Sequence, residues 1–214
     1  MRTLSMEKEE DILHAATEIF AEKGYYQTSI QSITQKAGVS TGTFYTYFKN
    51  KEEVLLAIYR KFSARLSDTL AEKNADTYPD STEKLIVCTA AIIQMYAENP
   101  PLSLILLTKI IGMSKLSEQE YYTVFYRVSQ VFEEMLSETG QTVFPDYYLA
   151  AVAYLQLLNS LTTQWLTDPA GRSLSELAEM ILTYNFNALK LDTGKIRDTI
   201  HSVLEGEDVY APQI

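Results

Sequence analysis

Residues 28–51 gather small hydroxyl, glycine, phenol and lysine side chains whose types and spacing suit contacts with a nucleic acid. Thr28 and Ser29 open a short helical pattern, where unpaired backbone N–H groups favour a phosphate oxygen. Gly42 permits close approach of the backbone at the start of a second helix, and the hydroxyls around it suit a major groove. The candidate contacts are Thr28, Ser29, Ser40, Thr41, Gly42, Thr43, Tyr45, Thr46, Tyr47, Lys49 and Lys51.

Two short helices and a turn must position these side chains. Residues 30–37 place apolar groups at helical spacing, Gly38 permits a tight turn, and Ser40 supplies the N-cap of a helix over 41–48. Phe44 and Phe48, four residues apart, should fasten this helix to an earlier one over residues 8–23. The pattern is typical of a helix-turn-helix.

The rest of the chain also shows helical spacing of its apolar residues, and no segment has convincing period-two alternation. We therefore predict an all-α fold with about nine to ten helices. An N-terminal DNA-binding domain of residues 1–52 is expected to contain three helices, and a larger domain should cover residues 53–214. One long helix over residues 51–73 should link them. Further helices are expected over 83–98, 102–113, 117–138, 146–167 and 173–190, with a short one after Gly194.

Charge is divided unevenly along the 214 residues. Residues 1–65 hold nine Lys or Arg against eight Asp or Glu, whereas the remainder holds nine against twenty and carries the excess of the net charge of −10. The lone Cys88 cannot form an intrachain disulfide and fits a reducing compartment. The N-terminus has no apolar signal segment, and the longest apolar stretches are too short to cross a membrane. We expect a cytoplasmic protein.

The segment Ile12–Phe62 resembles the TetR family of bacterial one-component regulators. It combines F-A-E-K-G-Y, T-S-I, A-G-V-S, G-T-F-Y-x-Y-F and K-N-K-E-E-V at the family's spacing. The resemblance implies a homodimer that binds a palindromic operator, represses transcription and is released by a ligand in the second domain. Thr41 departs from the basic residue that many relatives have after Ser40, so direct guanine readout cannot come from that position.

The second domain offers a candidate dimer interface and a candidate ligand cavity. Helices over 146–167 and 173–190 are too apolar to face water, and two copies of the pair would form a four-helix bundle. The predicted interface residues are Ala150, Ala153, Leu157, Leu158, Leu161, Leu177, Met180, Ile181 and Tyr184. The predicted cavity residues are Phe62, Ile92, Met95, Leu107, Ile111, Tyr122, Phe125, Tyr126, Tyr154 and Asn159, which suit a small hydrophobic or aromatic effector.

Two other classes of protein are weaker interpretations. An enzyme is disfavoured because His14 and His201 lie in no metal-binding spacing, and no phosphate-binding loop or nucleophile motif occurs. We therefore predict no catalytic residues, no metal and no cofactor. An all-helical protein-interaction adaptor would explain the acidic second domain but leaves the helix-turn-helix unexplained. The sequence therefore favours a ligand-responsive repressor with DNA, a small effector and a second copy as partners.

Overall fold

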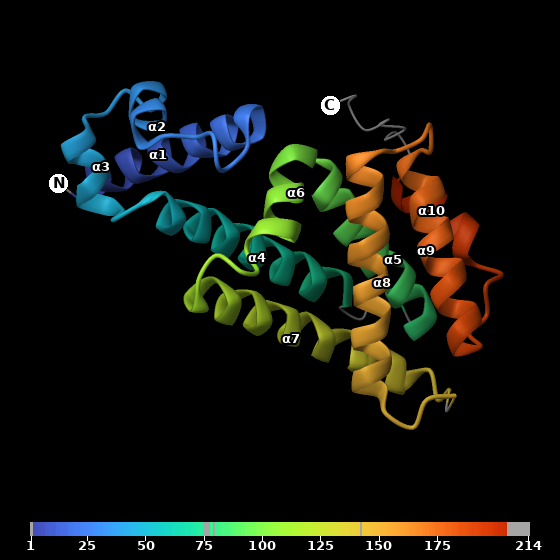
Figure 1. Cartoon of the computed structure of the whole chain (residues 1–214). Coiled ribbons are helices and arrows are strands. Elements are labelled where there is room, and N and C mark those ends of the chain that lie inside the picture. Colours follow the sequence, from blue (N-terminus) through green and yellow to red (C-terminus); the bar gives the residue numbers. More distant parts are fainter. Residues whose placement is uncertain (1, 75–77, 79, 142, 205–214) are drawn as a thin grey trace.

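The computed structural model describes residues 2–74, 78, 80–141 and 143–204, with residues 2–6 described by their backbone alone. Every regular element in these ranges is a helix, which confirms the predicted all-α class (Figure 1). The helices are α1 Arg2–Lys23, α2 Ile30–Lys36, α3 Thr41–Tyr47, α4 Lys51–Asn74, α5 Ser81–Ala97, α6 Pro100–Lys109, α7 Lys115–Glu138, α8 Tyr147–Thr167, α9 Leu174–Leu189 and α10 Ile196–Leu204.

Local side-chain chemistry sets most helix ends. Ser114 and Ser173 form capping boxes at the starts of α7 and α9, satisfying backbone N–H groups that have no partner within the helix. α6 begins earlier than predicted, because Asn99 caps it and Pro100 is tolerated in the first turn. The same helix ends four residues early, at Lys109, and Gly112 adopts a left-handed φ of 85° in the turn that follows.

Two hydrophobic clusters hold the fold together. The N-terminal cluster joins α1, α2, α3 and the first part of α4, and it also buries Ile105 and Leu106 from α6 and Ile110 at its C-cap. The larger cluster surrounds α5, which packs against α4, α7, α8, α9 and α10 and is buried on nearly every side, as its apolar sequence predicts. The clusters do not divide at residue 52, since the N-terminal one continues along α4 as far as Tyr59.

The long helix α4 connects the two halves of the molecule. It begins beside α3 and runs next to α7 into the larger domain (Figure 1). Leu66 and Leu70, near its far end, belong to the larger cluster. α4 is therefore one continuous element that leads from the helix-turn-helix to the centre of the second domain.

Candidate nucleic-acid interface and internal cavity

α3 has one buried aromatic face and one polar exposed face. Phe44 and Phe48 are buried in the N-terminal cluster, as their spacing predicts. Gly38, with φ of 66°, forms the turn between α2 and α3. On the opposite face Thr41, Gly42 and Thr46 are exposed and the Tyr45 ring is 56% exposed. The arrangement presents small polar groups and a phenol to a nucleic-acid groove.

Two predicted contact residues have structural roles instead. Thr28 is buried, and its hydroxyl donates to the Gly24 carbonyl oxygen at 2.8 Å, so it cannot reach a phosphate. Ser40 is exposed, but its Oγ accepts the Thr43 backbone N–H as the N-cap of α3 and also bonds the Thr43 hydroxyl. The prediction of a DNA contact by Thr28 is therefore wrong, and Ser40 acts first as a cap.

Lys51 is also turned away from solvent, contrary to its predicted role at phosphate. Its Nζ donates to the carbonyl oxygens of Tyr25 at 2.7 Å and Thr28 at 2.9 Å, and it lies over the Tyr25 ring. Burial lowers the pKa of this ammonium below its ordinary value. Lys51 therefore fixes the loop that leads into α2, and its charge is directed inward.

The remaining candidates stay together on one surface. Lys49 is 87% exposed and pairs with Glu53 at 3.5 Å, a solvent-screened contact that a phosphate can replace. Ser29 is exposed and caps α2 in a capping box with Ser32. The surface that keeps the predicted character consists of Ser29, Thr41, Gly42, Thr43, Tyr45, Thr46, Tyr47 and Lys49.

A cavity of about 40 Å³ lies in the larger domain between α4, α5, α7 and α8. Ile92, Phe125 and Asn159 line it, as predicted. Sequence reasoning missed the other lining residues: Tyr59, Leu66, Tyr96, Tyr121, Val124, Val128 and Leu155. On α7 the signal was present, because Tyr121, Val124, Phe125 and Val128 continue the apolar stripe that leads to Phe132.

The other predicted lining residues lie elsewhere. Tyr122 and Tyr126 are 59% and 50% exposed, because they lie one helical position away from the inward stripe, and Ile111 is also exposed. Tyr154 is buried in the core, where its hydroxyl bonds that of Thr89 at 2.8 Å. Phe62 stacks on Tyr96 but does not line the cavity, and Met95 and Leu107 pack in or against the larger cluster.

Three phenols give the cavity its polar character. Tyr59, Tyr96 and Tyr121 all line it, and burial raises the pKa of each, so the three are neutral hydrogen-bond donors near neutral pH. The Asn159 side chain partly offsets the effect of burial on the pKa of Tyr121. The Tyr96 hydroxyl has no hydrogen-bond partner within the described part of the chain, although its side chain is buried. The cavity thus combines apolar walls with neutral donors and no charged lining residue.

Several predicted dimer residues belong to the core of a single chain. Ala150, Leu158, Leu177 and Ile181 are buried in the larger cluster, so their predicted place in an interface is wrong. Ala153, Met180 and Tyr184 are exposed, while Leu157 and Leu161 are half-buried. Met180, Thr183, Tyr184 and Ala188 line a shallow depression on the outer face of α9, together with Glu176, Glu179 and Asn187. The exposed residues of α9, Met180 and Tyr184, are therefore available for contact with a partner, whereas its most apolar residues are not.

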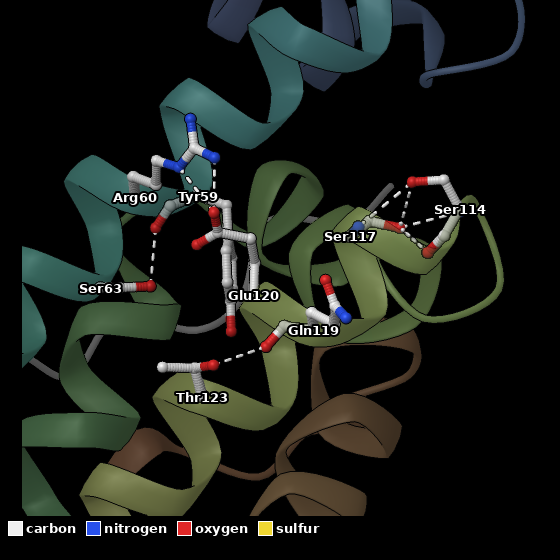
Figure 2. Close-up of polar contacts among 8 residues, drawn as sticks. All are labelled: Tyr59, Arg60, Ser63, Ser114, Ser117, Gln119, Glu120 and Thr123. Carbon is white, nitrogen blue, oxygen red and sulfur yellow. Dashed lines mark hydrogen bonds and ion pairs between the residues drawn. The ribbon is translucent and has the colours of Figure 1, made fainter.

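An ion pair joins α4 to α7 beside the cavity. Arg60 donates from Nε to Glu120 Oε1 at 3.1 Å and from a second guanidinium nitrogen to the same oxygen (Figure 2). Tyr59 precedes Arg60 on α4, and Tyr121 follows Glu120 on α7. Both tyrosines line the cavity, so the ion pair lies directly beside the cavity wall.

Within the described ranges, no group of three or more His, Cys, Asp or Glu side chains is placed to hold a metal ion. In the same ranges, no helix has both the length and the apolar character needed to span a membrane.

The fold and the exposed polar face of α3 together define a helix-turn-helix DNA-binding protein with a second, larger helical domain. Residues 12–63 match the sequence profile described as bacterial regulatory proteins, tetR family. The fatty acid metabolism regulator protein of Bacillus subtilis is 25% identical over 179 residues, which cover 80% of this chain and 90% of the relative. The regulator HbdR of Aromatoleum sp. is 47% identical over 49 residues, covering 23% of this chain and 21% of that protein.

Solved structures have the same fold. The regulator FadR of Bacillus subtilis in complex with stearoyl-CoA superposes with a TM-score of 0.73 at 22% identity, covering 84% of this chain and 98% of the other. The fatty acid degradation regulator FadR of Bacillus halodurans gives 0.75 at 24% identity, covering 86% and 97%. Residues 12–63 thus correspond to the matched segment of the tetR family of bacterial regulatory proteins, and the described residues have the same fold as these regulators.

Proposed function

We propose that this protein is a repressor that binds a palindromic operator as a homodimer through α3 and is released when a fatty acyl effector enters the cavity. The observation that carries the proposal is the continuity of α4, which begins close to the end of α3 and contributes Tyr59 and Leu66 to the cavity wall. A single rigid helix can convert a change in the cavity into a displacement of the DNA-binding surface.

The chemistry of the cavity supports an acyl effector. Its walls are aliphatic and aromatic, and the Tyr96 hydroxyl is free to donate to a carbonyl or thioester oxygen. A charged end would find no counter-ion among the lining residues, since none of them is charged. The likeness to a fatty acid metabolism regulator, and to a structure that contains stearoyl-CoA, supports the same class of ligand.

The small volume of the cavity supports a mechanism in which effector binding moves helices and so releases the operator. A volume of about 40 Å³ holds a few water molecules, whereas ligand sites usually measure roughly 300–1,000 Å³. An acyl chain therefore has to displace α4, α7 or both. Displacing α4 changes the separation of the two α3 helices in a dimer, and operator half-sites fix that separation. A coupling free energy of about 1–3 kcal/mol would weaken operator binding roughly 5- to 150-fold.

The oligomer and the absence of catalysis belong to the same proposal. The exposed Met180 and Tyr184 on α9, with Ala153 and Leu157 on α8, supply an apolar surface that a second copy can cover. Two copies would present two α3 helices to the two halves of a palindrome. We propose a regulatory role without an enzymatic reaction, because the cavity contains phenols and one amide but no activated nucleophile.

The test is fluorescence anisotropy with a labelled DNA fragment from directly upstream of the protein's own reading frame. The purified protein should bind it with a salt-dependent affinity, and stearoyl-CoA should reduce that affinity at least about fivefold while free coenzyme A should not. Tyr45→Ala should lose DNA binding while keeping the melting temperature. No DNA binding by the wild type would favour the adaptor interpretation, and unaltered binding in the presence of stearoyl-CoA would overturn the acyl effector.

A further inference from the structure

A polar groove of about 240 Å³ runs along the outer side of the helices that wall the cavity. Matching faces form it, with residues at positions i, i+3, i+4 and i+7 on each helix. They are Arg60, Ser63, Ala64 and Ser67 from α4 and Glu120, Thr123, Val124 and Arg127 from α7. Val124 also lines the cavity, so one side chain separates the two spaces.

The charges in this groove are not balanced. Arg127 is exposed and has no ion-pair partner in the described part of the chain. Arg60 directs two nitrogens to a single oxygen of Glu120, which leaves its other guanidinium nitrogen free to donate (Figure 2). Two guanidinium groups and one carboxylate line the groove, giving it a positive charge in a half of the protein that is strongly acidic. The excess positive charge in the groove therefore attracts an anion.

The hydroxyls in the groove limit what else could bind there. Ser63 donates to the Tyr59 carbonyl and Thr123 to the Gln119 carbonyl (Figure 2). Ser67 donates to the Ser63 carbonyl, so all three bonds lie within their own helices. Their oxygens remain as acceptors, but their protons are already engaged. The free donors are those of Arg60 and Arg127, and a guanidinium prefers an oxyanion with several oxygens, such as phosphate.

We propose that the α4–α7 groove binds the phosphate groups of an amphipathic effector whose acyl chain enters the neighbouring cavity past Val124. This proposal rests on the acyl effector proposed above and assigns it a second subsite. The phosphate competes with the Glu120 carboxylate for Arg60 and so loosens the ion pair that joins α4 to α7. Binding at the groove and opening of the cavity then favour each other, because both separate the same two helices.

The test is isothermal titration calorimetry of the full-length protein with stearoyl-CoA, 1-stearoyl lysophosphatidate and methyl stearate. Arg127→Gln and Arg60→Gln should each weaken stearoyl-CoA binding roughly fivefold to tenfold. Arg127→Gln should not change the affinity for methyl stearate, which has no phosphate. Arg60→Gln also removes the ion pair between α4 and α7, so it should not lower that affinity and can raise it. Arg172→Gln is the matched control, because Arg172 is an exposed arginine between α8 and α9 without an ion pair in the described ranges.

Glu120→Gln provides a second readout that a purely structural role would not give. Removing the competing carboxylate should strengthen stearoyl-CoA binding by a few fold, opposite to the arginine variants. Equal sensitivity of lysophosphatidate and stearoyl-CoA would support a phosphate subsite for lipid headgroups generally, and sensitivity of stearoyl-CoA alone would support a nucleotide diphosphate.

Two outcomes would overturn the proposal in distinguishable ways. If wild-type protein binds stearoyl-CoA and all variants bind it equally, the groove has no role while the acyl effector stands. If wild-type protein binds none of the three compounds, the acyl effector proposed above fails, and the groove assignment fails with it.

Discussion

Lys51 on α4 and Tyr25 in the α1–α2 connection are joined by a hydrogen bond of 2.7 Å from Nζ to the carbonyl oxygen, and the same ammonium lies 4.4 Å from the centroid of the Tyr25 ring. This contact spans 26 positions in the sequence and ties the start of α4 to the loop that leads into α2. In the proposed release mechanism, a displacement of α4 would therefore reach the helix-turn-helix through this side chain as well as through the α3–α4 connection.

Replacing Lys51 by Met should destabilise the fold and weaken DNA binding without removing a phosphate contact. The variant leaves the carbonyls of Tyr25 and Thr28 without a donor, which costs about 1–3 kcal/mol. We expect a lower melting temperature and weaker operator binding with an unchanged dependence on salt. Lys49→Ala is the comparison, because it should keep the melting temperature and lower the salt slope by about 1. If Lys51→Met lowers the salt slope and Lys49→Ala lowers the melting temperature instead, Lys51 contacts a phosphate and Lys49 has the structural role.

Gly42→Ala should weaken operator binding while it stabilises the fold, if the backbone at the start of α3 approaches DNA closely. A Cβ at Gly42 would meet only Ser40 Oγ, at 3.6 Å, so the fold accommodates it, and the loss of glycine from α3 should stabilise the helix by up to about 1 kcal/mol. The added methyl group would obstruct a groove-bound backbone and should weaken operator binding roughly tenfold. Chemical denaturation and fluorescence anisotropy measure the two effects. Undiminished operator affinity would show that the start of α3 does not approach DNA closely.

Acidic substitutions should distinguish the outer face of α9 from the core. Tyr184→Asp, at a side chain that is 65% exposed, should convert a homodimer into a folded monomer in sedimentation velocity. Leu158→Asp should instead unfold the protein, since Leu158 is fully buried within one chain. Circular dichroism reports folding in both variants. A dimeric Tyr184→Asp protein would place the interface elsewhere.

The Asp80 carboxylate should contribute to stability at neutral pH but not in acid. The Lys195 ammonium, 3.0 Å away, and the Thr82 N–H hold the pKa of Asp80 below its ordinary value, so the folded state releases this proton more readily than the unfolded state. The contribution is complete above the unfolded pKa of about 3.9 and is lost as pH falls through the lower folded pKa.

Asp80→Asn isolates this charge, because asparagine can still cap α5. Melting temperatures of the variant and the wild type should differ at pH 7 and converge below about pH 4. Asp68→Asn, at an exposed carboxylate, should show a smaller difference at pH 7. A gap that persists at low pH would assign the effect to lost packing rather than charge.

Local signals made the helix-turn-helix predictable from the sequence. Gly38, Ser40 and the Phe44–Phe48 pair act within a few residues of one another, so the turn, the cap and the buried face of α3 follow without knowledge of the fold. The helices of the second half were found for the same reason, because their apolar spacing persists over several turns.

The sites that depend on distant contacts were predicted less well. Lys51 was assigned to phosphate because its partners, the carbonyls of Tyr25 and Thr28, are backbone atoms that have no sequence signature. The phenol-rich run around Tyr122 does not reveal the phase of α7, which is set by packing against α8, so the sequence predicts Tyr122 in the cavity where the structure has Tyr121. Leu158 and Ile181 were assigned to an interface because apolarity alone does not distinguish a subunit's own core from a surface between subunits.

Ile105 and Leu106 of α6 and Ile110 at its C-cap are buried in the N-terminal cluster, so α6 belongs to the packing of the DNA-binding half. A chimera that grafts only the first 52 residues onto another regulator would leave the side of α1 that receives these residues facing a foreign helix. Cavities there would destabilise the graft by several kcal/mol, in the range of about 2–5 kcal/mol for each large side chain lost. The portable unit is therefore discontinuous in sequence: α1 to α4 have to be transplanted together with α6.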